Sequence, residues 1–126
     1  MAINWEDKEQ AALFAWAAVM EKQYPELGLM FAIPNGGKRP PRTAAKMKAT
    51  GVKAGVPDIF LPVPRGMYFG FFVELKAIYP DGREGRVSDK QEAWVEALRA
   101  RGYKVEVIAG WQNAADQIES YLRLWV

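Results

Sequence analysis

The 126-residue chain contains neither cysteine nor histidine. Without cysteine it can form no disulfide, no thiolate nucleophile and no cysteine-ligated zinc site, so we expect a reducing, cytoplasmic environment. Without histidine, serine–histidine triads, histidine general bases and most zinc sites are excluded as well. Any hydrolytic chemistry must therefore use carboxylates, lysine and a metal ion.

No signal peptide or membrane-spanning segment is visible in the sequence. The apolar run over residues 11–20 is too short to cross a bilayer and is flanked by charged residues in helical rhythm. Half of the residues are hydrophobic and a quarter are charged, as is ordinary for a globular protein. Length and composition together predict a single domain over residues 1–126.

Acidic residues are missing from the interval between Glu26 and Asp58. The net charge of the chain is only +2, so this interval concentrates positive charge that would suit a polyanionic partner. A solvated basic loop and helix face is the alternative explanation of the same pattern. The candidate nucleic-acid-binding residues of this basic block are Lys38, Arg39, Arg42, Lys46 and Lys53.

The hydrophobic periodicity predicts alternating helices and strands. Helices are expected over residues 5–23, 40–50 and 88–102 and from about residue 111, and strands over 57–63, 68–77 and 103–108, with a short apolar run at 30–33 as a further strand. Ser88 and Gln91 have the spacing of a capping box, and Gly51 is expected to cap the second helix. The five tryptophans occupy amphipathic positions and are expected in the core. This order predicts an α/β fold with a mixed central sheet flanked by helices.

Two of the predicted strands carry charged residues inside apolar runs. Asp58 follows Pro57 at the start of one strand, and Glu74 and Lys76 lie two residues apart in the next. Since residues two apart on a strand share a face, Glu74 and Lys76 point the same way. If the two strands are neighbours, Asp58 can approach Glu74 on that face.

Two carboxylates side by side repel each other unless a cation lies between them. Oxygen ligands without nitrogen or sulfur suit Mg²⁺ or Mn²⁺, so Asp58 and Glu74 are candidate ligands of such an ion. Lys76 could orient the attacking water or stabilise the transition-state anion. The alternative is an ordinary ion pair of Glu74 and Lys76 on an edge strand.

The pattern Pro57-Asp58, an interval and Glu74-x-Lys76 resembles the motif of the PD-(D/E)xK nuclease superfamily, whose core is restriction-endonuclease-like. The flanking residues sharpen the resemblance to its VRR-NUC family, whose small stand-alone members are often phage-encoded. The match runs from about residue 35 to residue 108 and includes Gly51-x-x-x-Gly55-x-Pro57-Asp58, Glu74-x-Lys76, a glycine loop, Ser88-x-x-Gln91 and Gly102-Tyr103 before a strand.

The resemblance implies roles for particular residues. It implies the backbone carbonyl of Leu75 as a third metal ligand beside Asp58 and Glu74, and Lys76 as the catalytic lysine. Gln91 matches a glutamine of the following helix, although a capping box explains it equally well. The family usually has an acid on its first helix; Glu6 with Gln10 fits best, Glu9 is the rival, and a solvated acidic first turn explains either.

The function implied is that of a Mg²⁺- or Mn²⁺-dependent DNA endonuclease that hydrolyses phosphodiester bonds. Structured or branched DNA, such as four-way (Holliday) junctions or flaps, is the substrate that the resemblance favours. Stand-alone relatives are often dimers, and a homodimer with two sites would suit a junction, but the residues alone do not fix the oligomeric state. The alternative is a non-catalytic nucleic-acid-binding module on the same fold, which would have no need of two adjacent acids facing an anionic ligand.

Overall fold

The computed structural model describes residues 3–34 and 41–126. Its helices are α1 (Trp5–Met20), α2 (Pro41–Ala49), α3 (Asp89–Arg99) and α4 (Trp111–Leu122), with a 3₁₀ helix, η1 (Pro25–Leu29), after α1. Its strands are β1 (Phe31–Ala32), β2 (Ile59–Leu61), β3 (Phe71–Lys76) and β4 (Lys104–Ala109). The order of helices and strands is the predicted one, with η1 as the addition.

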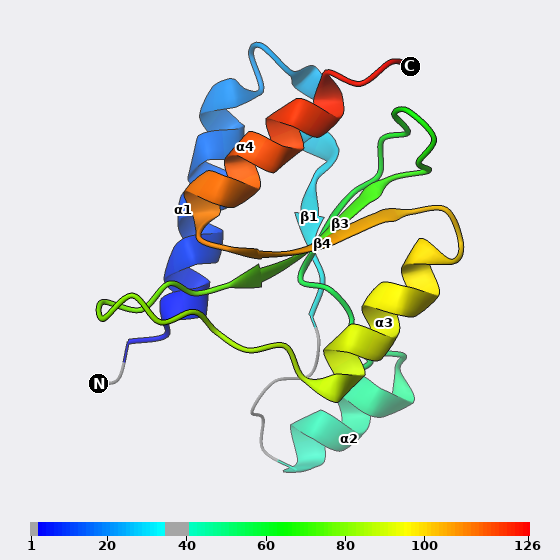
Figure 1. The fold of residues 1–126 in the computed structure, drawn as a ribbon. Coiled ribbons are helices and arrows are strands. Elements are labelled where there is room, and N and C mark those ends of the chain that lie inside the picture. The colour runs from blue at the N-terminus through cyan, green and yellow to red at the C-terminus, as the bar shows by residue number, and fades with distance from the viewer. Residues whose placement is uncertain (1–2, 35–40) are drawn as a thin grey trace.

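The four strands form one sheet in the order β1-β2-β3-β4 (Figure 1). The pairs β1–β2 and β2–β3 are antiparallel, whereas β3 and β4 are parallel and are connected through α3. This arrangement confirms the expected α/β fold with a mixed sheet flanked by helices. It also makes β3 an interior strand of the sheet, which pairs with β4 along its whole length and with β2 over residues 71–73.

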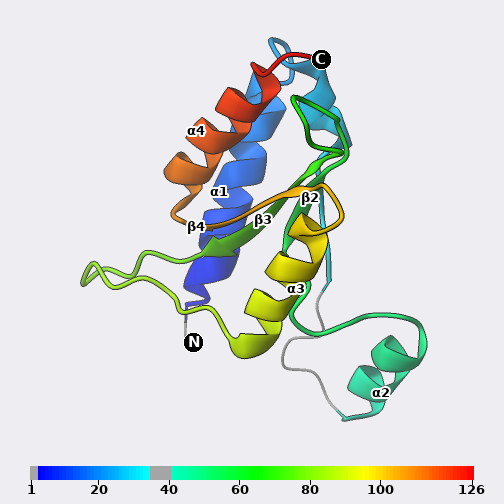
Figure 2. The ribbon, with the colours of Figure 1, turned by 45° about the vertical axis from the view of Figure 1, so that its right-hand side comes forward.

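The two faces of the sheet are covered differently. Helices α1 and α4 lie side by side against one face, and α3 packs on β4 from the other (Figures 1 and 2). Alternate residues of β3, namely Phe71, Val73 and Leu75, are fully buried in the core beneath α1 and α4. Strand alternation therefore turns Phe72, Glu74 and Lys76 to the opposite face, as the sequence predicts for Glu74 and Lys76.

The strands around the charged residues are shorter than predicted. Strand β2 ends at Leu61 because Pro62 offers no N–H to the ladder, and the N–H of Val63 turns back to the carbonyl of Leu61 at 2.9 Å. Strand β3 begins only at Phe71 because Tyr68 pairs with Arg65 in the connecting turn. Strand β2 also begins only at Ile59, so Asp58 lies just before its first residue, at the margin of the sheet.

Helix α1 begins after Asn4, whose side-chain oxygen accepts the N–H of Asp7 at 3.0 Å. It ends at Met20 rather than at Gln23, because Pro25 has no N–H to continue the helix and the N–H groups of Gln23 and Tyr24 both bond to the Met20 carbonyl. Across residues 3–34 and 41–126, no helix is long and apolar enough to span a membrane.

The expectation that the tryptophans form the core was wrong. Trp5, Trp16, Trp94 and Trp111 are only partly buried, and Trp125 lies beyond α4 with 66% of its surface exposed. Trp16 and Trp111 pack against the edge of the core, which aliphatic residues, Phe71 and Tyr121 fill instead. Large side chains at amphipathic positions here cover the rim of the core, where one edge of the ring keeps contact with water.

Helix α2 projects away from the sheet (Figure 2). Gly51 caps the C-terminal end of the helix, as the sequence predicts. It has φ of +97°, and its N–H donates to the carbonyl of Lys48. The next N–H, that of Val52, bonds to the carbonyl of Met47. These two bonds form a Schellman motif, which requires the left-handed conformation that glycine adopts without strain.

Candidate functional site

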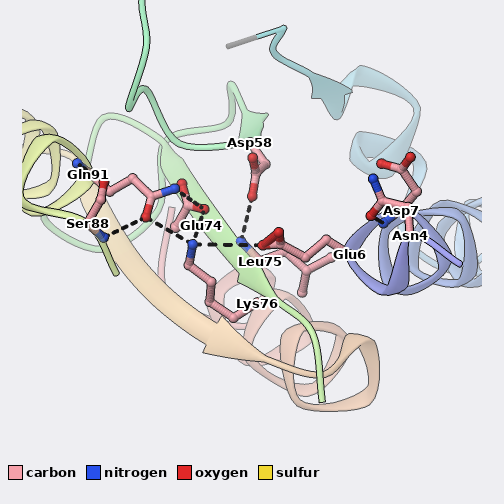
Figure 3. A network of polar contacts seen from close by, with 9 residues as sticks. All are labelled: Asn4, Glu6, Asp7, Asp58, Glu74, Leu75, Lys76, Ser88 and Gln91. Carbon is pink, nitrogen blue, oxygen red and sulfur yellow. Dashed lines mark hydrogen bonds and ion pairs between the residues drawn. The ribbon is translucent and has the colours of Figure 1, made fainter. Parts of the chain in front are cut away.

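The antiparallel pairing of β2 with β3 brings Asp58 and Glu74 together. Ile59 stands opposite Val73, so the preceding residue of one strand, Asp58, faces the following residue of the other, Glu74. The Asp58 carboxylate accepts the N–H of Leu75 at 3.0 Å (Figure 3). The two carboxyl groups thus lie side by side at the open end of the β2–β3 hairpin, as the sequence predicts for neighbouring strands.

Lys76 and Gln91 complete a network around Glu74 (Figure 3). The Nζ of Lys76 lies 3.4 Å from Oε2 of Glu74 and 2.9 Å from Oε1 of Gln91. Gln91 in turn donates from Nε2 to Oε2 of Glu74 at 3.2 Å. Glu74 is 1% exposed and Lys76 5% exposed, so this is a buried cluster of charges rather than a surface ion pair.

Gln91 completes the predicted capping box and also contacts the charged residues of β3. Its Oε1 accepts the backbone N–H of Ser88 at 2.9 Å, while the Ser88 hydroxyl accepts the N–H of Gln91, which completes a capping box. The same Oε1 accepts from Lys76. The cap of α3 therefore fixes the orientation of the amide that contacts Glu74 and Lys76.

The first helix contributes Glu6 to the cluster, and Glu9 lies elsewhere. Oε1 of Glu6 is 3.8 Å from Nζ of Lys76. Glu9 instead accepts the backbone N–H groups of Ile78 at 3.0 Å and Trp111 at 3.2 Å, which joins α1 to the end of β3 and to the start of α4. The structure thus brings Glu6, and not its rival, next to Lys76.

Burial dominates the electrostatics of the two carboxyl groups. Desolvation, followed by the charge of Asp58 and a hydrogen bond to it, raises the pKa of Glu74 from its ordinary value of 4.5 to about 8. Desolvation also raises the pKa of Asp58, against the opposing effects of hydrogen bonds from Glu74 and Leu75 and of the charge of Lys76. The single ammonium of Lys76 therefore does not compensate both carboxylates.

Asp7 is a residue that the sequence reasoning missed. After the dominant effect of desolvation, the charge of Asp7 adds to the rise in the pKa of Asp58. Asp7 is exposed in the first turn of α1, next to Glu6. The signal available in the sequence was the adjacent pair of acids at the start of a helix, which helix-dipole stabilisation already explained.

The cluster has the features expected of a metal site. Oε1 of Glu74 is buried and has no hydrogen-bond partner within residues 3–34 and 41–126, an arrangement that is unfavourable unless a cation or ordered water meets it. The Leu75 carbonyl points toward the same side as its N–H, which bonds to Asp58. Among the described residues, no three acids are grouped so that they could hold a metal ion together, so two carboxylates, this carbonyl and water are the available ligands. Such a set suits Mg²⁺, which keeps several waters.

Three residues of the basic block, Arg42, Lys46 and Lys53, lie within the described part of the chain. Arg42 and Lys46 are exposed on α2, and Lys53 is exposed in the loop that leads to Asp58. Lys38 and Arg39 lie outside the described residues. Residues of α2 and of the start of α3, the helix that carries Gln91, line one cleft.

Comparison with known proteins agrees with this arrangement. The family model of the VRR-NUC domain matches residues 3–112. A solved structure described as a VRR_NUC domain protein is similar to this chain with a TM-score of 0.78 at 27% identity, over 99% of this chain and 93% of that one. No curated protein matches the chain. The chain belongs to the VRR-NUC family, whose domains are of nuclease type and in general use divalent metals to act on DNA.

Proposed function

We propose that this chain is a Mg²⁺- or Mn²⁺-dependent DNA endonuclease that works as one nuclease domain over residues 1–126. The observation that carries the proposal is the pairing of the buried Glu74 with the partly buried Asp58, in which Oε1 of Glu74 has no hydrogen-bond partner among the described residues and Lys76 lies beside it. Carboxylates kept together in this way are unfavourable without a cation. A protein that only bound DNA would gain nothing from acids at the surface that meets phosphates.

Asp58, Glu74 and the Leu75 carbonyl would hold the metal ion, which when bound activates water and stabilises charge on a phosphoryl oxygen. Lys76 would act directly on the reacting phosphate, because its ammonium group lies on the same face as Glu74 at 3.4 Å. A fixed positive charge in a site shielded from water stabilises negative charge that develops in the transition state.

Gln91 and Glu6 would position Lys76. Gln91 accepts from Nζ of Lys76 at 2.9 Å, and Glu6 attracts the same group from 3.8 Å on the opposite side. A lysine side chain has several rotatable bonds, so contacts from α1, β3 and α3 reduce its freedom before substrate binds. In this view, Gln91 and Glu6 influence the reaction through the lysine.

The basic block would hold the DNA backbone near the site. Arg42, Lys46 and Lys53 are exposed, and we extend the proposal to Lys38 and Arg39 from the sequence. Contacts of this type position nucleic acid without reading its bases. For the substrate we propose structured or branched DNA, such as four-way junctions or flaps, which a homodimer with two sites would suit. This substrate choice rests on the resemblance to the family.

A panel of end-labelled DNA structures tests the proposal. Duplex, nicked duplex, flap, four-way junction and single-stranded DNA are incubated with the protein in Mg²⁺, Mn²⁺ or EDTA, and the products are mapped. We expect internal cleavage that requires the metal and favours a branched structure. Binding without cleavage in every metal would instead identify a binding module, and light scattering of the same samples reports whether a dimer forms.

A further inference from the structure

A cleft lies between α2, the loop after it and α3. This cleft has a volume of about 570 Å³, within the range of small-ligand pockets. None of the nine described residues that line it is acidic. The large apolar side chains of the lining are Met47, Val52 and Trp94, and its cationic side chains are Lys48, Lys53 and Lys90.

The walls of the cleft are fixed by local structure. Lys90 and Trp94 are four residues apart on α3 and so share one face of the helix, and Met47 and Lys48 lie in the last turn of α2. Gly55 has φ of +90°, and a Cβ at this position would come within 3.0 Å of the Lys90 backbone. The loop before β2 can pack against the start of α3 only because residue 55 is glycine.

The cleft and the acidic cluster use neighbouring residues of one helical turn. Gln91 directs its amide to Glu74 and Lys76, while the adjacent Lys90 lines the cleft. On the other side, the loop that carries Lys53 runs directly into Asp58. A DNA strand whose phosphates lie at the acidic cluster would therefore pass the opening of the cleft.

We propose that the cleft binds an unpaired nucleotide of the DNA, with its base against Trp94 and Met47 and its phosphates near the three lysines. Inside a duplex both faces of a base are covered by its neighbours, whereas an unpaired base can turn out of the stack, enter the cleft and lie on a tryptophan side chain. An indole ring with lysines around it and no acid in the lining is complementary to a nucleobase that carries a phosphate. The proposal rests on the proposed DNA nuclease function and adds that single-stranded character beside the cleavage point is recognised.

Binding in EDTA separates this proposal from cleavage. The probes are a fluorescein-labelled DNA hairpin with a blunt end and the same hairpin with a short thymidine overhang, and the readout is fluorescence anisotropy. We expect the wild-type protein to bind the overhang hairpin about tenfold more tightly than the blunt one. Trp94→Leu should remove most of this preference and leave blunt-end binding unchanged. The matched control is Trp125→Leu, whose exposed tryptophan lies outside the cleft.

If Trp94→Leu does not fold, the proposal can still be tested with two other changes to the cleft, each with its own control. Ala54→Glu puts a negative charge into the cleft from an exposed loop position, and Ala49→Glu, exposed at the end of α2 and outside the lining, is its control. We expect only the first to weaken overhang binding. Changing Lys48, Lys53 and Lys90 together to Gln should also lower the salt dependence of overhang binding, by about 0.7 for each lost phosphate contact, whereas Lys22→Gln should not.

Several outcomes would overturn the proposal. Equal affinity of the wild-type protein for the two hairpins would do so. A loss of affinity in Trp94→Leu or Ala54→Glu that is the same for both hairpins would also do so. The third such outcome is a loss of overhang affinity in either variant that is no larger than the loss in its control. Cleavage is then measured separately in Mg²⁺. If the protein prefers the overhang but cleaves no substrate, the nuclease function is refuted and the nucleotide-binding cleft is supported. If it cleaves DNA but shows no overhang preference, the nucleotide-binding cleft is refuted and the nuclease function is supported.

Discussion

Nζ of Lys76 lies 2.9 Å from Oε1 of Gln91, and that oxygen also accepts the backbone N–H of Ser88 that begins the cap of α3. One acceptor atom therefore links the stability of a helix end to the position of the lysine in the acidic cluster. Substitutions at Gln91 and Ser88 can separate these two roles, because only Gln91 touches the cluster.

Ser88→Ala should lower the stability of the protein by about 1 kcal/mol, the usual effect of losing an N-cap, while cleavage is retained. Gln91→Glu keeps an acceptor for the cap but replaces the amide that donates to Glu74 with a negative charge. We expect it to fold and to cleave at least about tenfold more slowly. Urea unfolding and single-turnover cleavage of both variants check this. If Gln91→Glu cleaves as fast as Ser88→Ala, the glutamine is only a helix cap.

Asp58→Asn and Glu74→Gln should each abolish cleavage while the fold survives. Each substitution keeps the size of the side chain and removes an anionic oxygen that a divalent ion needs. The melting temperature should not fall much, because each substitution replaces a carboxyl group that desolvation and its neighbouring acid disfavour in the charged form. The readouts are cleavage in Mg²⁺ and Mn²⁺ and thermal unfolding.

Asp116→Asn and Glu96→Gln are the matched controls for these two variants, because both acids are exposed on helices and lie outside the cluster. Both controls should cleave normally. Undiminished cleavage by Asp58→Asn, or by the wild type in EDTA, would contradict the assignment.

Lys76→Ala should reduce cleavage far more than DNA binding. Electrostatic stabilisation of a transition state by one fixed group is typically worth roughly a hundredfold or more in rate. The measurement is the single-turnover rate and the DNA affinity of the variant, with Lys22→Ala as a control for loss of one positive charge. If rate and affinity fall by the same factor, Lys76 is a structural partner of Glu74.

The stability of the metal-free protein should fall as the pH rises from about 4.5 to about 8. Desolvation first, and then the charge of Asp58, raises the pKa of Glu74 to about 8, so the folded chain holds a proton that the unfolded chain has released. The stability contributed by this proton is fully present below pH 4.5 and lost as the pH passes 8. We expect a loss of about 1 kcal/mol or more.

Urea unfolding in EDTA across this range checks the prediction, with Glu74→Gln as the comparison that should lack most of the slope. Mg²⁺ or Mn²⁺ should reverse the effect at pH 8, because the ion binds the deprotonated carboxylates and stabilises the folded state. A wild-type stability profile that is identical to that of Glu74→Gln would contradict this explanation.

Neutralising Lys38, Arg39 and Arg42 together should weaken DNA binding with little dependence on sequence. Each lost phosphate contact should also reduce the slope of log affinity against log salt concentration by about one unit. Affinity is measured at several salt concentrations for the wild type and the triple variant. Equal slopes would mean that these residues are a solvated surface, and the loop with Arg83 and Arg86 would be the next candidate.

The sequence by itself determined the chemistry and most of the architecture. The lack of histidine and cysteine restricted the site to carboxylates and lysine, and strand alternation put Glu74 and Lys76 on one face. The Ser88 and Gln91 spacing and Gly51 predicted the ends of helices correctly. These features depend on neighbours within a few residues, so local pattern is sufficient to predict them.

Only the tertiary structure decided between Glu6 and Glu9. Both lie on α1 within one turn, and their partners, Lys76 for one and the backbone of Ile78 and Trp111 for the other, are about seventy or more residues away in the chain. Which acid reaches which partner depends on how α1 packs across β3 and α4, and helical periodicity carries no information about that packing. The same holds for Trp94, which the periodicity assigned to the core and which in the structure lines the cleft between α2 and α3.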